Sequence, residues 1–213
     1  MDEIISSHFF PVTSLPVFKA MPKIGRLSRG CTITEKIDGT NASIFIGGED
    51  PETVGLFLTG SRTRWITPTT DNYGFSHWAH EHKDDLLQLG PGHHFGEWWG
   101  LGIQRRYGMD RKRFSLFNVG RWEKAPRPDC VDIVPKLYEG LFEDRAIENM
   151  LMNLRVSGSV AAPGFMDPEG IVIYHHATKQ LFKKTLKNDE QPKGQGEEPK
   201  CIDPEREDLV MSQ

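Results

Sequence analysis

The sequence predicts an α+β domain built mainly of antiparallel strands. Short runs of β-branched and aromatic residues recur along the chain with short connections between many of them, which favours antiparallel pairing. Two longer stretches carry apolar residues at helical spacing, and runs of strands separate them, as in sheets with helices packed outside. The predicted strands cover residues 30–37, 42–47, 55–62, 93–99, 113–120, 131–139, 169–175 and 178–186.

The first two predicted strands flank a glycine turn. Asp38-Gly39 is a strong turn signal between residues 30–37 and 42–47. Lys36 lies at the end of the first run. A lysine in this position has its stem held by a sheet and its amine directed into a cleft, although a surface lysine beside a hairpin turn has the same local sequence.

Two helices are predicted among the strands. The first covers about residues 72–89, and its apolar side holds Phe75, Trp78, Ala79 and Leu86. The second covers about residues 143–155. Its apolar residues recur at i, i+3, i+4 and i+7, and they are Ile147, Met150, Leu151 and Leu154.

The chain has the length and apolar content of one domain. With 213 residues and 37% hydrophobic content it can bury one substantial core. From residue 188 to 200 no apolar side chain occurs, a composition typical of a flexible segment. We therefore predict a folded domain over residues 1–187 and a flexible polar tail over residues 188–213, with no carboxy-terminal accessory domain.

Composition also bears on the cellular location. The sequence has no run of about 18 apolar residues, and its first residues are acidic and polar, unlike a secretory leader. The three cysteines are odd in number and far apart, which argues against a disulfide framework and against a zinc site. We expect a soluble cytoplasmic protein without a membrane partner.

Lys36 is a candidate nucleophile in covalent nucleotide transfer. A lysine amine attacks phosphorus only in its neutral form, so its pKa must fall from about 10.4 through desolvation and neighbouring cations. A lysine between a strand and a glycine turn suits this chemistry. The residues farther along the chain decide between this interpretation and a surface lysine.

A series of short motifs follows in order. After Thr34 to Asn41, which contains Lys36, come Ser61-Arg62, Phe95 to Gly100, Phe114 to Val119, Glu169 to Ile173 and Leu181 to Lys184. This series resembles motifs I, Ia, III, IIIa, IV and V of the ATP-dependent polynucleotide ligases, and above all the RNA ligase 2 branch. Glu97 lies 61 residues after Lys36, and Glu169 lies 133 after it. Across about residues 30 to 190, these motifs in order are far more specific together than singly.

The resemblance implies an adenylation fold and a defined reaction. Lys36 would attack the α-phosphate of ATP to give lysyl-AMP and pyrophosphate, with Mg²⁺ or Mn²⁺ neutralising phosphate charge. The AMP would then pass to an RNA 5′-phosphate, and an RNA 3′-hydroxyl would displace it. In this scheme the other site residues are Arg62 at the ribose or phosphate, Glu97 at the ribose hydroxyls, Phe117 stacked on adenine, Glu35 at the base edge, Glu169 at the metal and phosphates, and Lys183 at the α-phosphate.

Each of these residues also has an ordinary structural interpretation. Glu97 can be a strand carboxylate, and Phe117 taken alone is typical of a core residue. Glu169 can be a turn charge, and Lys183 can belong to a solvated basic strand. Only their joint order along the chain favours the functional interpretation.

The chain departs from the family pattern at three positions. Asp38 replaces the histidine usual in the RNA ligase 2 branch, and Asn118 replaces an aspartate. Thr185 replaces a second lysine two residues after Lys183. Because side chains alternate across a strand, Lys184 should point away from Lys183 and cannot take over this role.

RNA contacts must come from a local basic patch, because the formal net charge is −4 and phosphate neutralisation supplies most of the affinity for nucleic acid. The candidates are Arg105, Arg106 and Arg111, although a solvated face has the same composition. The family's larger members carry a further domain after motif V. We therefore expect a minimal ligase or a core that works with a protein partner.

Other functions remain open from the sequence. Asp38 is also found in small DNA ligases and in guanylyltransferases that use GTP. A binding module that holds ATP or AMP without transferring it is a further alternative, to which Thr185 and Asn118 lend support.

Overall fold

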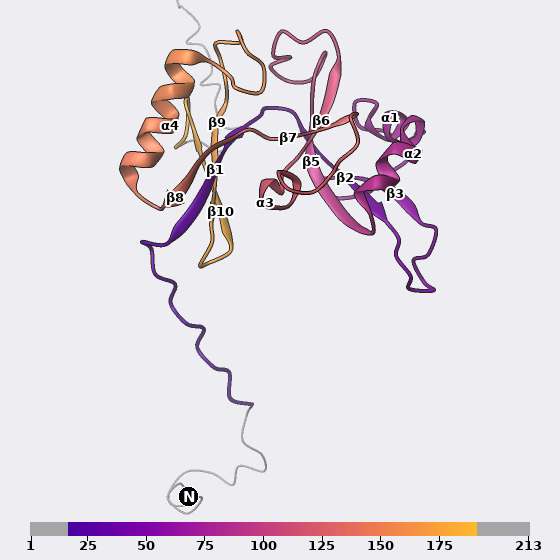
Figure 1. Cartoon of the computed structure of the whole chain (residues 1–213), viewed down its shortest axis with the longest axis horizontal. Coiled ribbons are helices and arrows are strands. Elements are labelled where there is room, and N and C mark those ends of the chain that lie inside the picture. Colours follow the sequence, from indigo (N-terminus) through magenta and orange to yellow (C-terminus); the bar gives the residue numbers. More distant parts are fainter. Residues whose placement is uncertain (1–16, 191–213) are drawn as a thin grey trace, which may run out of the picture.

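The chain folds into two sheets that lie side by side as two lobes (Figure 1). The computed structural model describes residues 17–190. The four-stranded sheet is antiparallel and has the order β10 (Gln180–Thr185), β9 (Gly170–His175), β1 (Gly30–Lys36) and β8 (Lys136–Leu141). The six-stranded sheet has the order β4 (Trp65–Ile66), β3 (Phe57–Ser61), β2 (Thr40–Ile46), β5 (Gly92–Gly100), β6 (Lys112–Leu116) and β7 (Val131–Ile133). Its pairs are antiparallel except β6 with β7. The predicted α+β class with antiparallel sheets is confirmed.

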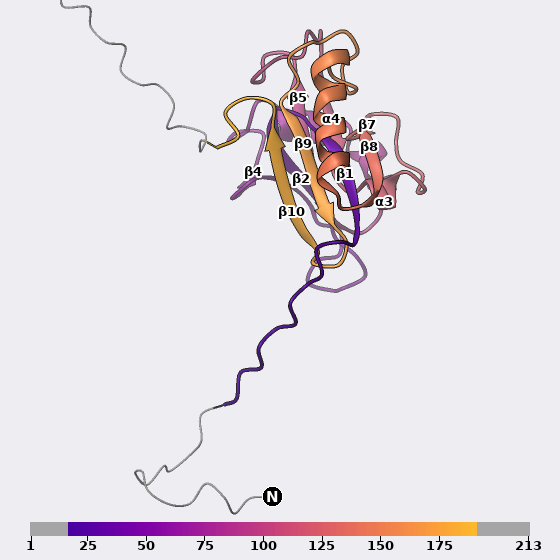
Figure 2. The same cartoon turned by 90° about the vertical axis from the view of Figure 1, so that its left-hand side faces the viewer.

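Helix α4 (Asp144–Ser157) covers one face of the four-stranded sheet and lies in front of it in Figure 2. Alternate residues of β1 and β9 point toward α4 and form a buried apolar cluster with it: Cys31, Ile33, Ile147, Leu151, Leu154, Ile171 and Ile173. The predicted helix over 143–155 is therefore confirmed. The residues that alternate with this cluster along β1 and β9 point to the opposite face of the sheet.

The predicted helix over 72–89 is divided into three short pieces: α1 (Phe75–Glu81), α2 (Lys83–Leu86) and a 3₁₀ turn, η1 (Leu87–Leu89). The break falls at His82, whose ring nitrogen and backbone amide both contact the carbonyl oxygen of Trp78. The change of direction lets apolar residues from all three pieces reach one core beneath the six-stranded sheet. These helices cover only one face of that sheet.

The turn at Asp38-Gly39 does not close a hairpin. Strands β1 and β2 belong to different sheets, so the chain crosses from one lobe to the other directly after Lys36. At Gly39 a side chain would overlap the Trp98 carbonyl and the Trp99 side chain. Only glycine permits so close an approach, and the turn signal in the sequence marks this crossing.

The predicted strand over 131–139 is two strands in different sheets. The chain leaves the six-stranded sheet after β7 and enters the four-stranded sheet at β8, with Val134 and Pro135 between them. Proline has no amide hydrogen to donate to a neighbouring strand, so Pro135 is suited to the point where the chain leaves one sheet and enters the other. The Pro135 carbonyl accepts the Glu35 amide at 2.9 Å, so this second crossing lies against the first.

The predicted strand over 113–120 ends early, at Leu116. The short helix α3 (Val119–Trp122) follows, and the Asn118 side chain caps it by accepting the Arg121 amide at 3.2 Å. The position where the family pattern has aspartate is thus a helix cap in this chain.

The predicted domain limits of 1–187 and 188–213 stay a prediction. The four-stranded sheet ends at Thr185, and residues 191–213 of the predicted tail lie outside the described residues. Within residues 17–190, no helix has the length and apolar character needed to span a membrane.

Candidate active site

Lys36 and Glu169 meet at the free face of the four-stranded sheet. Lys36 ends β1 opposite Gly170 of β9, so the register brings the preceding Glu169 beside it although 133 residues separate the two in sequence. The Lys36 Nζ donates to Glu169 Oε2 at 2.6 Å. Glu169 is buried, whereas Lys36 retains partial exposure toward solvent. The lysine therefore stands at an accessible site, in contact with a buried carboxylate.

Gly170 allows the strands beside this pair to come close together. It has φ +155°, and a side chain there would overlap the Lys184 carbonyl of β10. The neighbouring Leu186 amide also donates to the Glu169 carbonyl at 2.9 Å. The backbone around Glu169 is thus fixed from both sides.

Glu97 reaches the same site from the six-stranded sheet. It lies on β5, and its Oε1 accepts the Gly39 amide at 3.0 Å. Burial raises its pKa from 4.5 to about 7, against the opposing effects of the nearby Lys36 charge and the Gly39 amide. Glu169 and Asp38 act in the same direction as burial, as like charges do. Glu97 therefore changes its charge near neutral pH, next to the candidate nucleophile.

Two carboxylates next to a lysine fit a divalent cation that is shared with a phosphate. Among the described residues, no group of three or more His, Cys, Asp or Glu side chains could hold a metal by itself. Mg²⁺ is usually bound through one or two carboxylates together with substrate phosphates. In such an arrangement Glu169 would supply a carboxylate oxygen, together with the phosphates of the nucleotide.

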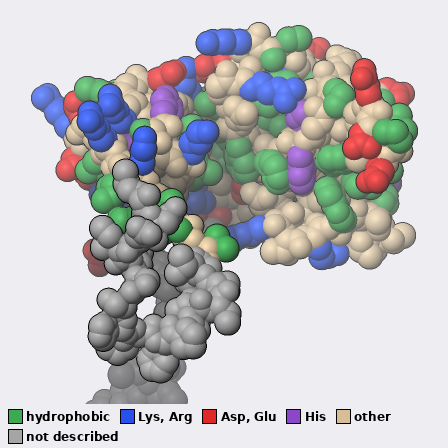
Figure 3. All heavy atoms as spheres, turned by 90° about the horizontal axis from the view of Figure 1, so that it is seen from below, with side chains coloured by type: hydrophobic (Ala, Val, Ile, Leu, Met, Phe, Trp, Pro, Cys, Tyr) green, Lys and Arg blue, Asp and Glu red, His purple; other side chains and the backbone are tan. Residues whose placement is uncertain are grey.

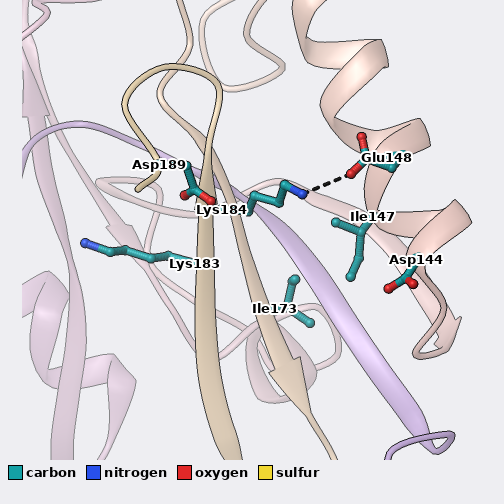
Figure 4. Close-up of a pocket in the computed structure, with 7 residues that line it drawn as sticks. All are labelled: Asp144, Ile147, Glu148, Ile173, Lys183, Lys184 and Asp189. Carbon is teal, nitrogen blue, oxygen red and sulfur yellow. Dashed lines mark hydrogen bonds and ion pairs between the residues drawn. The ribbon is translucent and has the colours of Figure 1, made fainter. Parts of the chain in front are cut away.

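Lys183 and Lys184 point to opposite faces of β10 (Figure 4). Lys183 pairs with Val172, which in turn pairs with Thr34, so Lys183 shares the sheet face of Lys36. Lys184 lies on the other face and pairs with Glu148 of α4 at 3.0 Å. The prediction that Lys184 points away from Lys183 is confirmed.

The pocket in Figure 4 lies between α4 and β10 and is lined by acidic, basic and apolar side chains: Asp144, Ile147, Glu148, Ile173, Lys183, Lys184 and Asp189. Ile147 and Ile173 belong to the core on the α4 side of the sheet. The pocket is thus not the site of Lys36, which ends β1 on the opposite face.

Thr185 stands where the family has its second lysine, and neither it nor the nearby Lys187 supplies a free positive charge. The Thr185 hydroxyl donates to the Lys187 carbonyl at 2.9 Å and to Asp189 Oδ1 at 3.2 Å, which builds the turn after β10. The Lys187 ammonium pairs with Asp167 at 2.8 Å. Lys183 alone therefore carries the positive charge of this strand on the Lys36 face.

Arg105 belongs to the site rather than to a free basic patch. Its guanidinium pairs with Asp38 at 3.0 Å and with Asp167 at 2.9 Å. The crossing after Lys36 is thereby tied to the segment that precedes Glu169. Two carboxylates hold this guanidinium, whereas the side chains of Arg106 and Arg111 are exposed. The RNA contact of all three arginines stays a prediction.

The Arg105 loop has an unusual backbone. Gln104, Arg106 and Tyr107 have φ values of 44°, 60° and 49°, in the left-handed region that costs non-glycine residues about 1 kcal/mol or more each. In this conformation the Tyr107 hydroxyl accepts a hydrogen bond from the Asp38 amide at 2.8 Å. Burial raises the pKa of Tyr107, so its hydroxyl stays neutral. The contacts of Tyr107 and Asp167 could not be predicted from the sequence, because both join residues that are more than 60 positions apart.

Glu35 points to the α4 side of the sheet, opposite to Lys36. It accepts the Ser159 hydroxyl at 2.6 Å and the amides of Val160 and Ala161 at 2.8 and 2.9 Å. Burial raises its pKa, although these three hydrogen bonds act in the opposite direction. The contacts give Glu35 a structural role in holding the loop after α4, and its contact with the base edge stays a prediction.

Phe117 and Arg62 both remain accessible. Phe117 is 38% exposed just beyond β6, and its amide donates to the Phe95 carbonyl at 3.0 Å. Arg62 lies in the exposed turn between β3 and β4. Both positions are open to a ligand, and their roles stay predictions.

Comparisons with known proteins show the family and the fold of this chain. Residues 30–187 match the family model described as RNA ligase. Three variant structures of a Naegleria gruberi RNA ligase share the fold at 18% identity: one with ATP and Mn (TM-score 0.55, covering 81% of this chain and 58% of that one), and two with AMP and Mn (0.53, 79% and 56%; 0.51, 80% and 57%). The chain thus spans somewhat more than half the length of these proteins. No curated protein sequence matches it.

The raised pKa of Glu97 predicts a pH-dependent stability. The folded state favours the protonated carboxyl, so its stabilising effect is complete below the unfolded pKa of about 4.5 and is lost as pH rises through about 7. Between pH 5 and pH 8 the wild type should lose on the order of 2 kcal/mol more unfolding free energy than Glu97→Gln. Urea unfolding at both pH values measures this difference. The exposed control Glu49→Gln should behave as wild type, and equal losses in wild type and Glu97→Gln would contradict the assignment.

Proposed function

We propose, since this chain belongs to the RNA ligase family, that it joins RNA ends with ATP through a covalent lysyl-AMP on Lys36. The observation that carries the proposal is the contact of Lys36 with the buried Glu169, beside a second carboxylate from the other lobe. Lysine, cation-binding oxygens and an open face for a nucleotide thus meet at one point. The fold of the Naegleria gruberi RNA ligase, solved with ATP and Mn, supports ATP and a divalent cation as cofactors.

The chemistry begins with a proton on Lys36. The ammonium form is held by Glu169 Oε2 at 2.6 Å, so Glu169 is the nearest acceptor when the amine loses its proton. The neutral amine then attacks the α-phosphorus of ATP, the N–P bond forms, and the bond to pyrophosphate breaks. A bound Mg²⁺ or Mn²⁺ would neutralise charge on the phosphate oxygens.

The remaining residues orient the nucleotide and carry charge. Lys183, on the same sheet face as Lys36, would contact the α-phosphate, and Arg62 would contact the ribose or phosphate. Glu97 would contact the ribose hydroxyls, and the exposed ring of Phe117 would stack on adenine. In the later steps an RNA 5′-phosphate oxygen takes the AMP from Lys36, and a 3′-hydroxyl displaces AMP from that phosphate.

One alternative has a specific observation in its favour. Thr185 builds a turn where the family has a second phosphate-binding lysine, and Asn118 is a helix cap where it has an aspartate. A module that binds ATP without transferring it fits these two substitutions. The DNA ligase and guanylyltransferase alternatives are distinguished from RNA ligation by nucleotide choice and by substrate.

We also propose that RNA binding by this chain is assisted by a protein partner. The formal net charge of −4 leaves few local phosphate contacts, and affinity for nucleic acid grows with their number. Self-adenylation depends only on the pocket and does not need the partner.

Incubation with radiolabelled ATP, GTP or NAD and a divalent cation, followed by denaturing electrophoresis, tests the proposal. We expect a covalent label from ATP alone, and its loss in Lys36→Arg, which keeps a positive charge that cannot be removed. A label that survives this substitution would place the nucleophile elsewhere. Labelling by GTP would indicate a guanylyltransferase, and no label from any nucleotide would favour the binding module.

The two lysines of β10 form a matched pair of variants. Lys183→Ala should slow adduct formation at least tenfold, about 1.4 kcal/mol of transition-state stabilisation. Lys184→Ala removes the same charge from the opposite face and should have little effect. Single-turnover adenylation rates decide the matter, and equal loss in both variants would show that only net charge matters.

Arginine variants separate support of the site from RNA contact. Arg105→Ala removes the partner of Asp38 and Asp167, so adduct formation should fall at least tenfold, on the order of the 1 to 3 kcal/mol for a lost charged hydrogen bond. Arg106→Ala with Arg111→Ala should spare the adduct and reduce joining of RNA ends. Both activities are measured on each variant. Unchanged joining in the double variant would mean that RNA enters elsewhere.

A further inference from the structure

The six-stranded sheet has a face that its helices leave open. Residues of β2 and β5 that alternate with the core point to this face, and Glu97 is one of them. Figure 3 shows hydrophobic and histidine side chains gathered on this lobe, beside the hollow between the two lobes. The aromatic members that the strand register places together are Phe45, Trp65, His93 and Phe95, which we call the aromatic patch.

The rings of the aromatic patch pack against one another, and all but the half-buried Phe45 are exposed. Trp65 is 52% and Phe95 is 48% exposed. Between them lies His93, with its ring centroid 5.3 Å from Trp65 in a stacked arrangement and 4.0 Å from Phe95. Phe45 contacts both Trp65 and His93 edge-on, at 6.2 and 6.0 Å. A continuous apolar surface is therefore held in place without any covering element among the described residues.

Two features of the aromatic patch favour a flat ligand. Trp65 lies beside Gly60, where a side chain would meet its ring at 3.3 Å, and it stacks on His93, so its ring is held in a fixed orientation. Burial lowers the pKa of His93, which keeps its imidazole neutral at neutral pH. The surface thus offers neutral π-faces rather than a mixture of charges.

The surroundings of the aromatic patch are those of a polyanion site. Phe95 adjoins Phe117 through the hydrogen bond between their backbones, so the patch continues toward the proposed adenine platform. Arg62 and Arg64 are exposed in the turn that joins β3 to β4, at the end of β3 nearer to the crossing. Neither forms an ion pair with any residue that the structure describes.

We propose that the aromatic patch binds unpaired bases of the RNA strand by stacking, an inference that rests on the proposed RNA ligase function. Bases have a π-face whatever their identity, so aromatic platforms bind single strands with little sequence preference. Arg64, which has no role in the proposed nucleotide site, would contact the phosphate that follows those bases. Stacking supplies affinity that does not depend on net charge, which suits a chain whose formal net charge is −4.

The test removes the two most exposed rings. Trp65→Thr with Phe95→Thr places a β-branched side chain, which is suited to a strand, at both positions and deletes the stacking surface. The matched control is Phe182→Thr on β10, which deletes a ring of similar exposure, 47%, on the α4 side of the other sheet. If thermal melting shows that the double variant is unfolded, Phe95→Leu replaces it, because leucine retains apolar bulk without a π-face.

Fluorescence anisotropy measures binding of a 5′-phosphorylated single-stranded RNA, and labelled ATP measures the adduct on the same proteins. The double variant should bind about tenfold more weakly, while the control and the adduct yield stay at wild-type values. The dependence of log affinity on log salt should keep its slope, because no phosphate contact is lost.

Wild-type affinity in the double variant would overturn the proposal and point to a protein ligand for the patch. Parallel loss of the adduct would also overturn it. Failure of wild type to form an adduct would refute the ligase function alone, since the binding comparison is independent of it.

Discussion

The crossing of the chain between its two sheets, directly after Lys36, is the constraint on which the rest of the site depends. One buried and one half-buried backbone amide lie there, and a buried amide without a partner is costly. The Tyr107 hydroxyl accepts the Asp38 amide and the Glu97 carboxylate accepts the Gly39 amide. Glu97 therefore has two functions at once: it completes the backbone of the crossing and it places a carboxyl beside Lys36. The position of the lysine relative to both lobes follows from these two hydrogen bonds.

Charges of opposite sign alternate around this crossing. Lys36 contacts Glu169, and Arg105 joins Asp38 to Asp167. Each cation is thus held by carboxylates that come from a distant part of the chain. A nucleoside triphosphate adds several negative charges to such a site. On binding, some of these lysine and arginine side chains would exchange a carboxylate for a phosphate, and some carboxylates would exchange a side-chain cation for a divalent cation. Lys183, on the same sheet face as Lys36, forms no ion pair with any other described residue.

Much of the fold could be predicted from periodicity, and the site from motif order, but the contacts across the lobes could not. The α4 helix and most strands follow the apolar pattern, and strand alternation places Lys183 and Lys184 on opposite faces. The two crossings were misassigned, one as a hairpin and one as a continuous strand, because a turn signal and a β-type run look the same whether or not the chain changes sheet. The ion pairs of Arg105 with Asp38 and Asp167 could not be predicted, since these carboxylates are remote in sequence. Strand alternation places Glu35 on the face opposite to Lys36, but its hydrogen bonds to the loop after α4 join residues more than 120 positions apart and could not be predicted.

The two crossings also make the six-stranded lobe a single uninterrupted insertion. Residues 40–133 contain all of its strands, whereas the four-stranded sheet pairs β1 with β8 and β9, more than 100 residues later in the chain. During synthesis the inserted lobe can complete its hydrogen bonding while β1 still lacks both neighbours, because local pairing closes shorter loops. Glu169 and Lys183 then arrive with the last strands. A chain interrupted before β9 therefore contains every strand of the six-stranded sheet but lacks Glu169, the ion-pair partner of Lys36.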